Sequence, residues 1–449
     1  MVLGSFAVMC AGYLGAQTAE DLLLTNVHVI VGNGDELLQT DVLLRDGRIA
    51  AVGEEISAAD RQSRVVDLTG KTLMPALIDG HSHLGYQSVE GWGAEHYSRE
   101  NLIRNLQQYL YYGFAAVFSA GSDPDDLALA LGADQREQNL PMARFLFAAG
   151  MAPPGQGPNN QFLGHTSRLE QELGMTILRG LESPEQARQQ VREVNAKGIQ
   201  FIKLWVDDRN GSQTKLSPEL YRAVAMEARA LGMKVFIHQQ FAEDMPDIIS
   251  SGAHGFLHGR IGAGFSNWIA FQAAANDVFV VPNLGLGELR RETIGRDSFL
   301  SPLLSAADQS RLSDASGPRQ VSPQQDRQYE NELAVGFTRL KNAGVELVLG
   351  TDAGAVPDHP FGYTGHRELE IFVRLGVSEM DALVAATGNA AKHLGLSDSG
   401  EIKAGNRADL LILNSNPLNN IRNTRDIHQV YFAGQEINRA ELLQQILQN

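Results

Sequence analysis

The chain has very little cysteine and comparatively little positive charge. Cys10 is the only cysteine among 449 residues, so no intramolecular disulfide framework can form. The 37 lysines and arginines are outnumbered by 53 aspartates and glutamates, which gives a formal net charge of −16. Because a phosphate backbone is bound by clustered lysine and arginine, this balance argues against a nucleic-acid partner.

Long apolar runs are confined to the start of the chain. Residues 1–19, MVLGSFAVMCAGYLGAQTA, contain no charged side chain and resemble the apolar core of a secretory signal peptide, with small residues at Ala16 and Ala19. Its removal would leave a periplasmic or secreted protein without any thiol. The alternative is a buried N-terminal strand in a cytoplasmic protein. After residue 19 no run approaches the ~18 apolar residues that span a bilayer, so no membrane span is expected.

Short β-like runs occur at both ends of the chain. The first end contains DLLLTNVHVI, DVLLRDGRIAAVG and RVVDLTGKTLMP, with a hairpin signal at Asp46-Gly47. The other end contains ADLLILN and HQVYFAGQEI. These runs predict one small β-sandwich domain assembled from residues 20–75 and 400–449.

The central part of the chain alternates apolar runs with helical patterns. The eight runs are LMPALIDGHSH, GFAAVFSAG, ARFLFAAG, FIKLWV, KVFIHQ, GFLHGR, VFVVPNL and VELVLGTDAG. Ser183-Pro184 and Ser217-Pro218 are helix starts, and Gly232 is a typical helix end. Eight near-continuous apolar strands separated by helices predict an α/β fold, a (β/α)₈ TIM barrel over residues 76–399. Residues 285–335 form a long polar insertion, either an active-site lid or a surface excursion.

Potential metal ligands stand at the carboxyl ends of four of these eight runs, and a fifth run, FIKLWV, carries Lys203. Barrel chemistry is built at those ends, so this placement tests the barrel prediction. His81 and His83 are one residue apart and point to the same side of a strand. The complete set of candidate metal ligands is His81, His83, Lys203, His238, His258 and Asp352.

Lys203 is the member of this set that needs explanation. An ammonium about 4 Å from a divalent ion is repelled by roughly 8 kcal/mol at an effective dielectric of 20, so it cannot lie in a metal shell. Either Lys203 pairs with Asp207 or Asp208 outside that shell, or its amine has reacted with CO₂. A carbamate is an anion with two oxygens that can bridge two metal ions.

The motifs LMPALIDGHSH, FIKLWVDD, VFIHQ, GAHGFLHG, GTDAG and GEIKAGNRADLLIL resemble those of the metal-dependent amidohydrolase superfamily. The resemblance is strongest to its imidazolonepropionase-like and Xaa-Pro-dipeptidase-like branch and covers about residues 21–445. It implies two divalent ions, usually zinc. His81, His83 and Asp352 would hold one ion, His238 and His258 the other, and a CO₂-derived carbamate on Lys203 would bridge them. It also implies a small-molecule substrate and a homo-oligomer.

The chemistry expected of such a centre is amide hydrolysis. Two ions lower the pKa of a shared water to about 7, and the resulting hydroxide attacks a carbonyl carbon. Asp352 is the expected catalytic acid–base. The expected substrates are N-acyl amino acids, Xaa-Pro-like dipeptides or cyclic amides. A lactone or phosphoester hydrolase on the same centre, a mononuclear deaminase or cyclic-imide hydrolase, and a non-catalytic binding protein are the alternatives.

Five further residues are candidates for contact with the substrate. Gln240 lies two positions after His238, where relatives acting on dipeptides often place a tyrosine, so the dipeptidase assignment is the less secure part of the resemblance. Arg260 could bind a carboxylate with two hydrogen bonds or make an ordinary ion pair. The remaining three candidates, which have packing or capping as their alternative role, are His165, His359 and His366.

Overall fold

The computed structural model describes residues 21–56, 63–138, 140–285, 293–314 and 322–448. The predicted signal segment, residues 1–19, lies outside the described residues. Two parts of the predicted insertion, residues 286–292 and 315–321, also lie outside them. Within the described chain, no helix is both long enough and apolar enough to cross a membrane.

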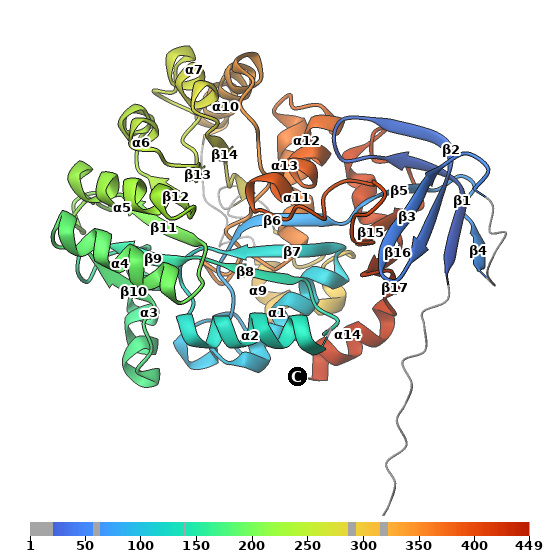
Figure 1. Ribbon diagram of the computed structural model, residues 1–449, viewed down its shortest axis with the longest axis horizontal. Helices are drawn as coiled ribbons and strands as arrows, with labels where there is room; N and C mark the ends of the chain where they lie inside the picture. Colours follow the sequence, from blue (N-terminus) through green and yellow to red (C-terminus); the bar gives the residue numbers. More distant parts are fainter. Residues whose placement is uncertain (1–20, 57–62, 139, 286–292, 315–321, 449) are drawn as a thin grey trace, which may run out of the picture.

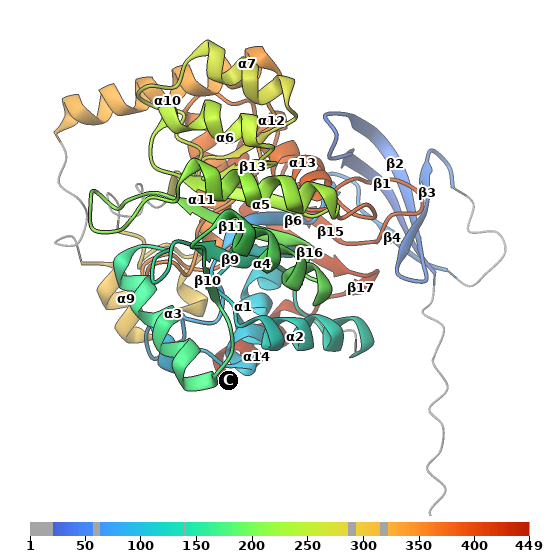
Figure 2. The same ribbon diagram turned by 60° about the vertical axis from the view of Figure 1, so that its left-hand side comes forward.

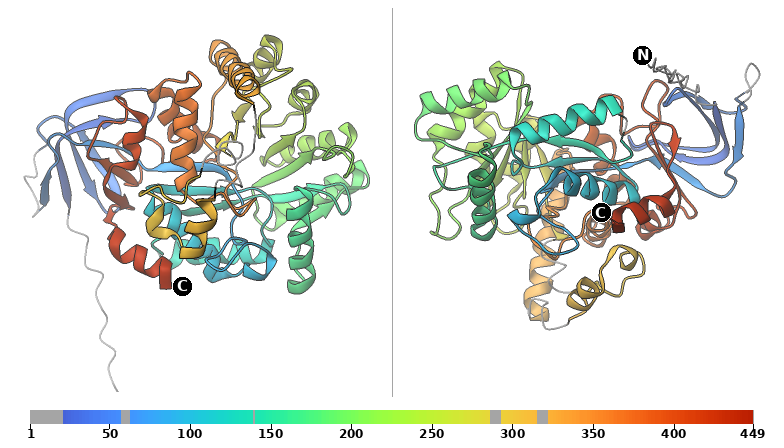
Figure 3. Two further views of the ribbon diagram at one scale, coloured as in Figure 1. Left: turned by 180° about the vertical axis from the view of Figure 1, so that it is seen from behind. Right: turned by 90° about the horizontal axis from the view of Figure 1, so that it is seen from below.

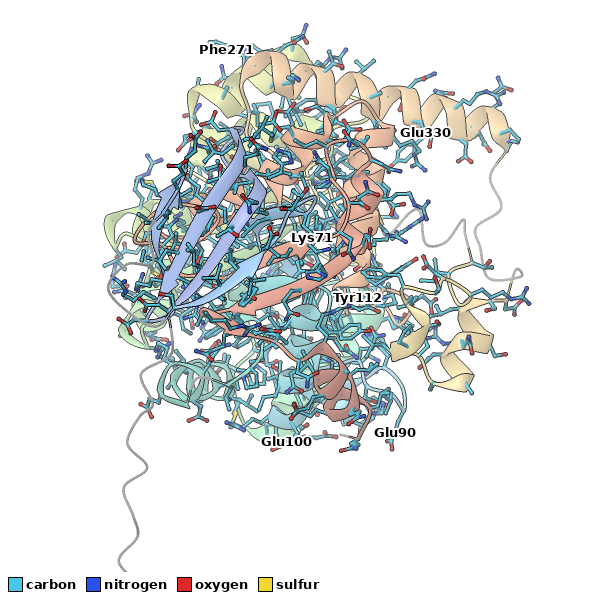
Figure 4. The ribbon with its side chains drawn as sticks, turned by 90° about the vertical axis from the view of Figure 1, so that its right-hand side faces the viewer. Lys71, Glu90, Glu100, Tyr112, Phe271 and Glu330 are labelled. Carbon is cyan, nitrogen blue, oxygen red and sulfur yellow. The ribbon has the colours of Figure 1, made fainter. Side chains whose placement is uncertain are left out.

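Strands from the two chain ends form one mixed sheet in the order β17-β16-β15-β5-β1-β2-β3, with β4 paired to β1. Figure 4 looks onto this sheet, where blue strands of the first residues lie beside red strands of the last. Its own apolar core includes Leu24, Val42, Leu73 and Ile412. The strands are β1 (Leu22–Ile30), β2 (Glu36–Arg45), β3 (Arg48–Gly53), β4 (Arg64–Asp67), β5 (Thr72–Pro75), β15 (Leu410–Leu413), β16 (Ile427–Phe432) and β17 (Gln435–Glu436).

The predicted apolar runs of the centre form parallel strands. They pair in two groups, β6-β7-β8 and β10-β9-β11-β12-β13-β14. The third run is divided at Ala148 into β8, which pairs with β7, and β9, which pairs with β11. The strands are β6 (Leu77–Ser82), β7 (Phe114–Ser119), β8 (Arg144–Phe147), β9 (Ala149–Ala152), β10 (Leu178–Gly180), β11 (Phe201–Val206), β12 (Lys234–Gln239), β13 (Gly255–Leu257) and β14 (Phe279–Val281). Only β10 has no counterpart among the runs read from the sequence.

The eighth run, residues 345–354, is not a regular strand, but it lies between the two groups. It makes parallel bridges from Leu347 to Val280 of β14 and from Ala353 to Ser82 of β6. Apolar side chains from the strands of both groups, among them Phe118, Phe236 and Phe279, pack with Val348 in a common cluster. Strands of both groups therefore contribute side chains to one apolar cluster.

Helices cover the outside of these strands. In Figure 1, β6, β7 and β8 run between α1 and α2 on one side and α11 to α13 on the other. Both helix starts predicted from the sequence are present. Ser183 caps α4 by accepting a hydrogen bond from Gln186 N, and Pro218 is the first residue of α5. The helices that follow the first strands are α1 (Arg99–Tyr111), α2 (Asp125–Gln138), α3 (Asn160–Leu173), α4 (Pro184–Ala196), α5 (Pro218–Ala230), α6 (Met245–Ser251) and α7 (Asn267–Ala275). The later ones are α9 (Ala306–Leu312), α10 (Pro323–Ala343), α11 (Tyr363–Arg374), α12 (Glu379–Ala385), α13 (Gly388–His393) and α14 (Arg439–Gln448).

Helix α9 lies within the predicted insertion, and helix α10 begins in it and continues beyond it. α9 and α10 lie at the outside of the molecule in Figures 2 and 3. α9 has no buried residue, whereas α10 packs with Leu333, Phe337 and Leu340 buried. At the chain end, α14 packs on α1 beside the parallel strands, with Arg439 Nε donating to Tyr111 O.

Asp79 joins the first and eighth runs. Its fully buried carboxylate accepts hydrogen bonds from His81 N (3.0 Å), Thr351 N (3.1 Å) and Thr351 Oγ1 (2.6 Å). Tyr109 Oη of α1 donates a fourth at 2.8 Å. Burial raises the pKa of Asp79 to about 6, so these donors are needed to keep it ionised at neutral pH. The carboxylate fixes the ends of the strands that carry His81 and Asp352.

We expect Asp79→Ala to lower the free energy of unfolding by about 3 kcal/mol, because buried donors lose their acceptor. Chemical denaturation of the metal-free protein measures this. Asp126→Ala is the matched control, since Asp126 lies at the start of α2 and pairs with Lys197 at the surface. An equal loss in both variants would contradict the structural role of Asp79.

Candidate metal centre

The structure brings four histidines and Asp352 together at the carboxyl ends of the parallel strands. Asp352 Oδ1 is 3.3 Å from His81 Nε2 and 3.1 Å from His83 Nε2. Asp352 Oδ2 is 3.1 Å from His258 Nε2. The rings of His238 and His258 have centroids 4.8 Å apart. Among described residues, ligand atoms of His81, His258 and Asp352 lie within 4.8 Å of one another, close enough to hold one ion.

Asn283 fixes the tautomer of His81. His258 N donates to Asn283 Oδ1 at 3.0 Å, so this amide atom is an acceptor. The same Oδ1 lies 2.9 Å from His81 Nδ1, which therefore carries the hydrogen. In neutral His81 the lone pair of Nε2 then faces the oxygen of Asp352. A lone pair and a carboxylate oxygen repel each other unless a cation lies between them, so this arrangement fits a metal ion.

Other contacts hold the remaining ligands in place. His83 Nδ1 lies 2.8 Å from Ser122 Oγ, which leaves Nε2 directed at Asp352. Three non-glycine residues around the site have positive φ: 67° for His258, 53° for Asn283 and 60° for Asp352. Such conformations cost of order 1–3 kcal/mol each and persist where surrounding contacts enforce them. Backbone strain is thus concentrated at the residues that follow the strands and carry site side chains.

Lys203 is fully buried on β11, with Nζ 3.4 Å from His81 Nε2. Burial lowers its pKa to about 7, an effect that Asp352 partly opposes. The predicted alternative partners are engaged elsewhere. Asp207 Oδ2 lies 2.7 Å from His238 Nε2 and 3.0 Å from Arg209 Nη1, and Asp208 accepts from Gln240. The alternative in which Lys203 pairs with Asp207 or Asp208 is therefore not formed, because both carboxylates contact other groups.

Burial also sets the protonation of the candidate ligands. It lowers the pKa of His81 and His238 well below the ordinary range and that of His258 to about 4. Burial alone would raise the pKa of Asp352, but His258 and His81 hold it well below its usual value. At neutral pH the cluster therefore consists of neutral imidazoles and an ionised carboxylate. These are the forms that bind divalent metal ions.

All six predicted ligands line one cavity of about 660 Å³. Tyr329 and Leu333 of α10 contribute to its wall, as do Phe162 of α3 and Trp205 of β11. The volume is in the range of small-molecule sites.

Two of the five tentative substrate contacts lie in this cavity lining, and three do not. Gln240 lines it, but its amide is bonded to Asp208 through both Nε2 (2.6 Å) and Oε1 (3.3 Å). Arg260 lines it and is exposed. His165 accepts a hydrogen bond from Ala94 N through Nδ1. His359 is buried near Gly285 and Glu368.

His366 is likewise outside the lining. Its Nδ1 lies 2.9 Å from Thr424 Oγ1 and its Nε2 lies 2.9 Å from Tyr112 O. Both ring nitrogens thus join α11 to the end of α1 and to the C-terminal segment.

Four residues at the site were not singled out as site residues from the sequence. Asn283 and Ser122 orient His81 and His83. Asp207 contacts His238, and Arg209 pairs with Asp207 and lines the cavity. Asn283 follows Pro282 just past β14, so its place at a strand end was the available signal.

Comparison with known proteins identifies the family. Residues 72–437 match the model of the amidohydrolase family. Imidazolonepropionase of Streptomyces griseus is 25% identical over 399 residues, which cover 86% of this chain and 89% of that protein. The 5-methylthioadenosine/S-adenosylhomocysteine deaminase of Carboxydothermus hydrogenoformans is 23% identical over 424 residues, 89% of this chain and 85% of its own. A solved Xaa-Pro dipeptidase with bound methionine has a TM-score of 0.70 at 21% identity, covering 93% of this chain and 100% of that one.

The fold and the site define a metal-binding hydrolase that acts on carbon–nitrogen bonds. The chain belongs to the amidohydrolase family, and the resemblance seen in its motifs is confirmed.

The pH dependence of stability can test the structural role of His366. Burial lowers its pKa to about 3, while an unfolded chain has about 6.5. Below pH 6.5 the unfolded state therefore binds a proton that the folded state does not, and stability falls. We expect His366→Gln to remove a slope of up to about 1.4 kcal/mol per pH unit between pH 6 and 4. Urea unfolding of the metal-free protein at several pH values measures the slope.

His428→Gln, which changes an exposed histidine of β16, provides the comparison. Partial burial lowers the pKa of His428 as well, but by less, so this variant should remove a clearly smaller slope than His366→Gln. Identical pH slopes in wild type and His366→Gln would show that His366 gains a proton in the folded state.

Proposed function

We propose that this protein is a binuclear metal-dependent hydrolase that cleaves the amide C–N bond of a small molecule. His81, His83 and Asp352 would hold one ion, His238 and His258 the other, and a carbamate on Lys203 would bridge them. The observation that carries the proposal is the Nε2 lone pair of His81 facing the Asp352 carboxylate, with a protonated Nδ1 held by Asn283. We also infer that the parallel strands close into a barrel through residues 345–354.

The ions, usually zinc in this family, would supply a nucleophilic water at neutral pH and polarise the substrate carbonyl. Asp352 is the residue placed to move the proton. Its carboxylate is ionised, so it can accept a proton from the attacking water. The same oxygen can then deliver that proton to the leaving nitrogen, which departs as a neutral amine. Phe162 and Trp205 form apolar parts of the cavity wall.

The carbamate on Lys203 is supported by its surroundings. The side chain is fully buried and lies beside a ligand, where a fixed ammonium would oppose metal binding. Its lowered pKa of about 7 leaves a substantial share of neutral amine at neutral pH, and only that form reacts with CO₂. Carbamate formation joins the nitrogen to the carbon of CO₂ and releases one proton.

A mononuclear deaminase is the second candidate, because one of the similar proteins carries that activity in its name. It would need only the single cluster of His81, His258 and Asp352. Metal analysis separates the two, since the binuclear proposal requires close to two ions per chain. A lactone or phosphoester hydrolase would share the centre and is distinguished by the substrate screen alone.

We expect Lys203→Ala to abolish hydrolysis, by at least about 100-fold, and to lower the metal content, because the bridging ligand is lost. Short-chain carboxylic acids should restore part of the activity by taking the place of the carbamate. Metal analysis and a hydrolysis screen of N-acyl amino acids, Xaa-Pro dipeptides, lactones and phosphoesters provide the measurements.

Lys341→Ala on the exposed surface of α10 serves as the control. In wild-type protein equilibrated with ¹³C-bicarbonate, a carbamate signal should appear by NMR and disappear in Lys203→Ala. One metal ion per wild-type chain, or unchanged turnover in Lys203→Ala, would contradict the bridged centre.

A further inference from the structure

A three-residue turn after β11 has a conformation that L-residues rarely adopt. Arg209, Asn210 and Gly211 have successive φ values of 53°, 59° and 83°. Left-handed residues normally occur singly, and a non-glycine residue there costs of order 1–3 kcal/mol. Strain of this kind persists only where surrounding contacts enforce it.

The contacts that enforce this turn are present on both sides. Asp208 Oδ1 accepts from Gly211 N at 3.2 Å and from Gln240 Nε2 at 2.6 Å. Gln213, which is buried, donates to Pro158 O at 2.8 Å and accepts from Gly157 N at 3.0 Å. The turn is therefore fixed between the loop before α3 and the end of β12.

The result of this bracing is a mostly buried arginine in the cavity wall. The Arg209 side chain is 18% exposed and lines the cavity beside His238. Its Nη1 pairs with Asp207 Oδ2 at 3.0 Å, and Nη2 has only a 3.4 Å contact with Gly157 O. A guanidinium has five N–H donors, so Arg209 has capacity for a further acceptor. Asp207 orients it and offsets part of the cost of its burial.

The cavity lining contains more arginines than carboxylates, although the chain as a whole is strongly acidic. Apart from Lys203, the charged residues of its lining are Arg209, Arg260 and the single carboxylate of Asp352. Among the described residues Arg260 has no ion-pair partner. The two arginines are close enough that Arg260 helps to lower the pKa of Arg209, after the larger effect of burial. Two cations on one wall of a cavity attract an anionic group of the ligand.

We infer that Arg209, with Arg260, binds the free carboxylate of the substrate, so that the enzyme prefers N-acyl amino acids or dipeptides over neutral amides and cyclic amides. This inference rests on the proposed hydrolysis of an amide bond. Arg209 is a specificity-determining residue in this arrangement, because it contacts the carboxylate and not the reacting bond. The strained turn holds the guanidinium in place before the substrate arrives.

The test compares pairs of substrates that differ only in the carboxylate. Acetate release is measured from N-acetyl-L-amino acids and from their carboxamides, for wild type, Arg209→Gln, Arg260→Gln and Arg192→Gln. Wild type should favour the acid. Arg209→Gln should lower kcat/KM for the acid by about 10- to 100-fold, mainly through KM, and change the carboxamide by less than about 3-fold. Arg260→Gln should act in the same direction.

Arg192→Gln is the matched control, since Arg192 also pairs with one carboxylate, that of Glu227, but on the outer face of α4. Metal content is measured in each variant, because Asp207 contacts His238 as well. Equal loss for acid and carboxamide in Arg209→Gln, or a wild type that does not distinguish them, would overturn the inference and leave the proposed hydrolysis intact. Absence of hydrolysis for every acyl and dipeptide substrate would instead refute the proposed function.

Discussion

The buried carboxylate of Asp79 is the constraint on which the site depends. Its four hydrogen bonds join the first parallel strand, the eighth run and α1 at the level where His81 and Asp352 leave the backbone. These two ligands come from distant parts of the sequence, and neither lies on a long regular ladder at that point. Asp79 acts together with the direct hydrogen bond from Asp352 N to His81 O (2.7 Å) to hold these two ligands in a fixed relation. A charge buried for this purpose costs stability, and the strained backbone around the cavity adds to that cost.

The four candidate ligand histidines differ in the groups that orient their rings. Asn283 gives its one acceptor to both His258 N and His81 Nδ1, so a single amide aligns two ligands from different strands. Ser122 performs the corresponding task for His83. His238 is different, because its Nε2 faces Asp207, which is also the partner of Arg209. Asp207 therefore links His238 directly to Arg209 in the cavity wall.

The sequence predicted most of the central strands because an apolar, β-branched run is a strong local sign of a strand buried on both faces. His81, His83, Lys203, His238, His258 and Asp352 were singled out because they are polar residues in or just after such runs. All six line one cavity, and their binding of metal stays a prediction. The contacts of Asn283, Asp207 and Arg209 could not be read in the same way, because they depend on loop geometry and on backbone conformations that no residue pattern encodes. His366 was ambiguous for the same reason: its two ring partners, Tyr112 and Thr424, are remote in sequence.

The sheet shared by the two chain ends has a consequence for how the protein is made. β5 pairs with β15 over Met74–Leu411 and Leu73–Ile412, so the first five strands cannot complete their sheet until the last segment has left the ribosome. During synthesis their edge must remain unpaired while the whole central region is translated. Pairing of such widely separated segments is slow, because the entropy of closing the loop is lost before the contacts form. An exposed strand edge of this duration is a natural binding site for a chaperone and a point at which newly made chains can associate wrongly.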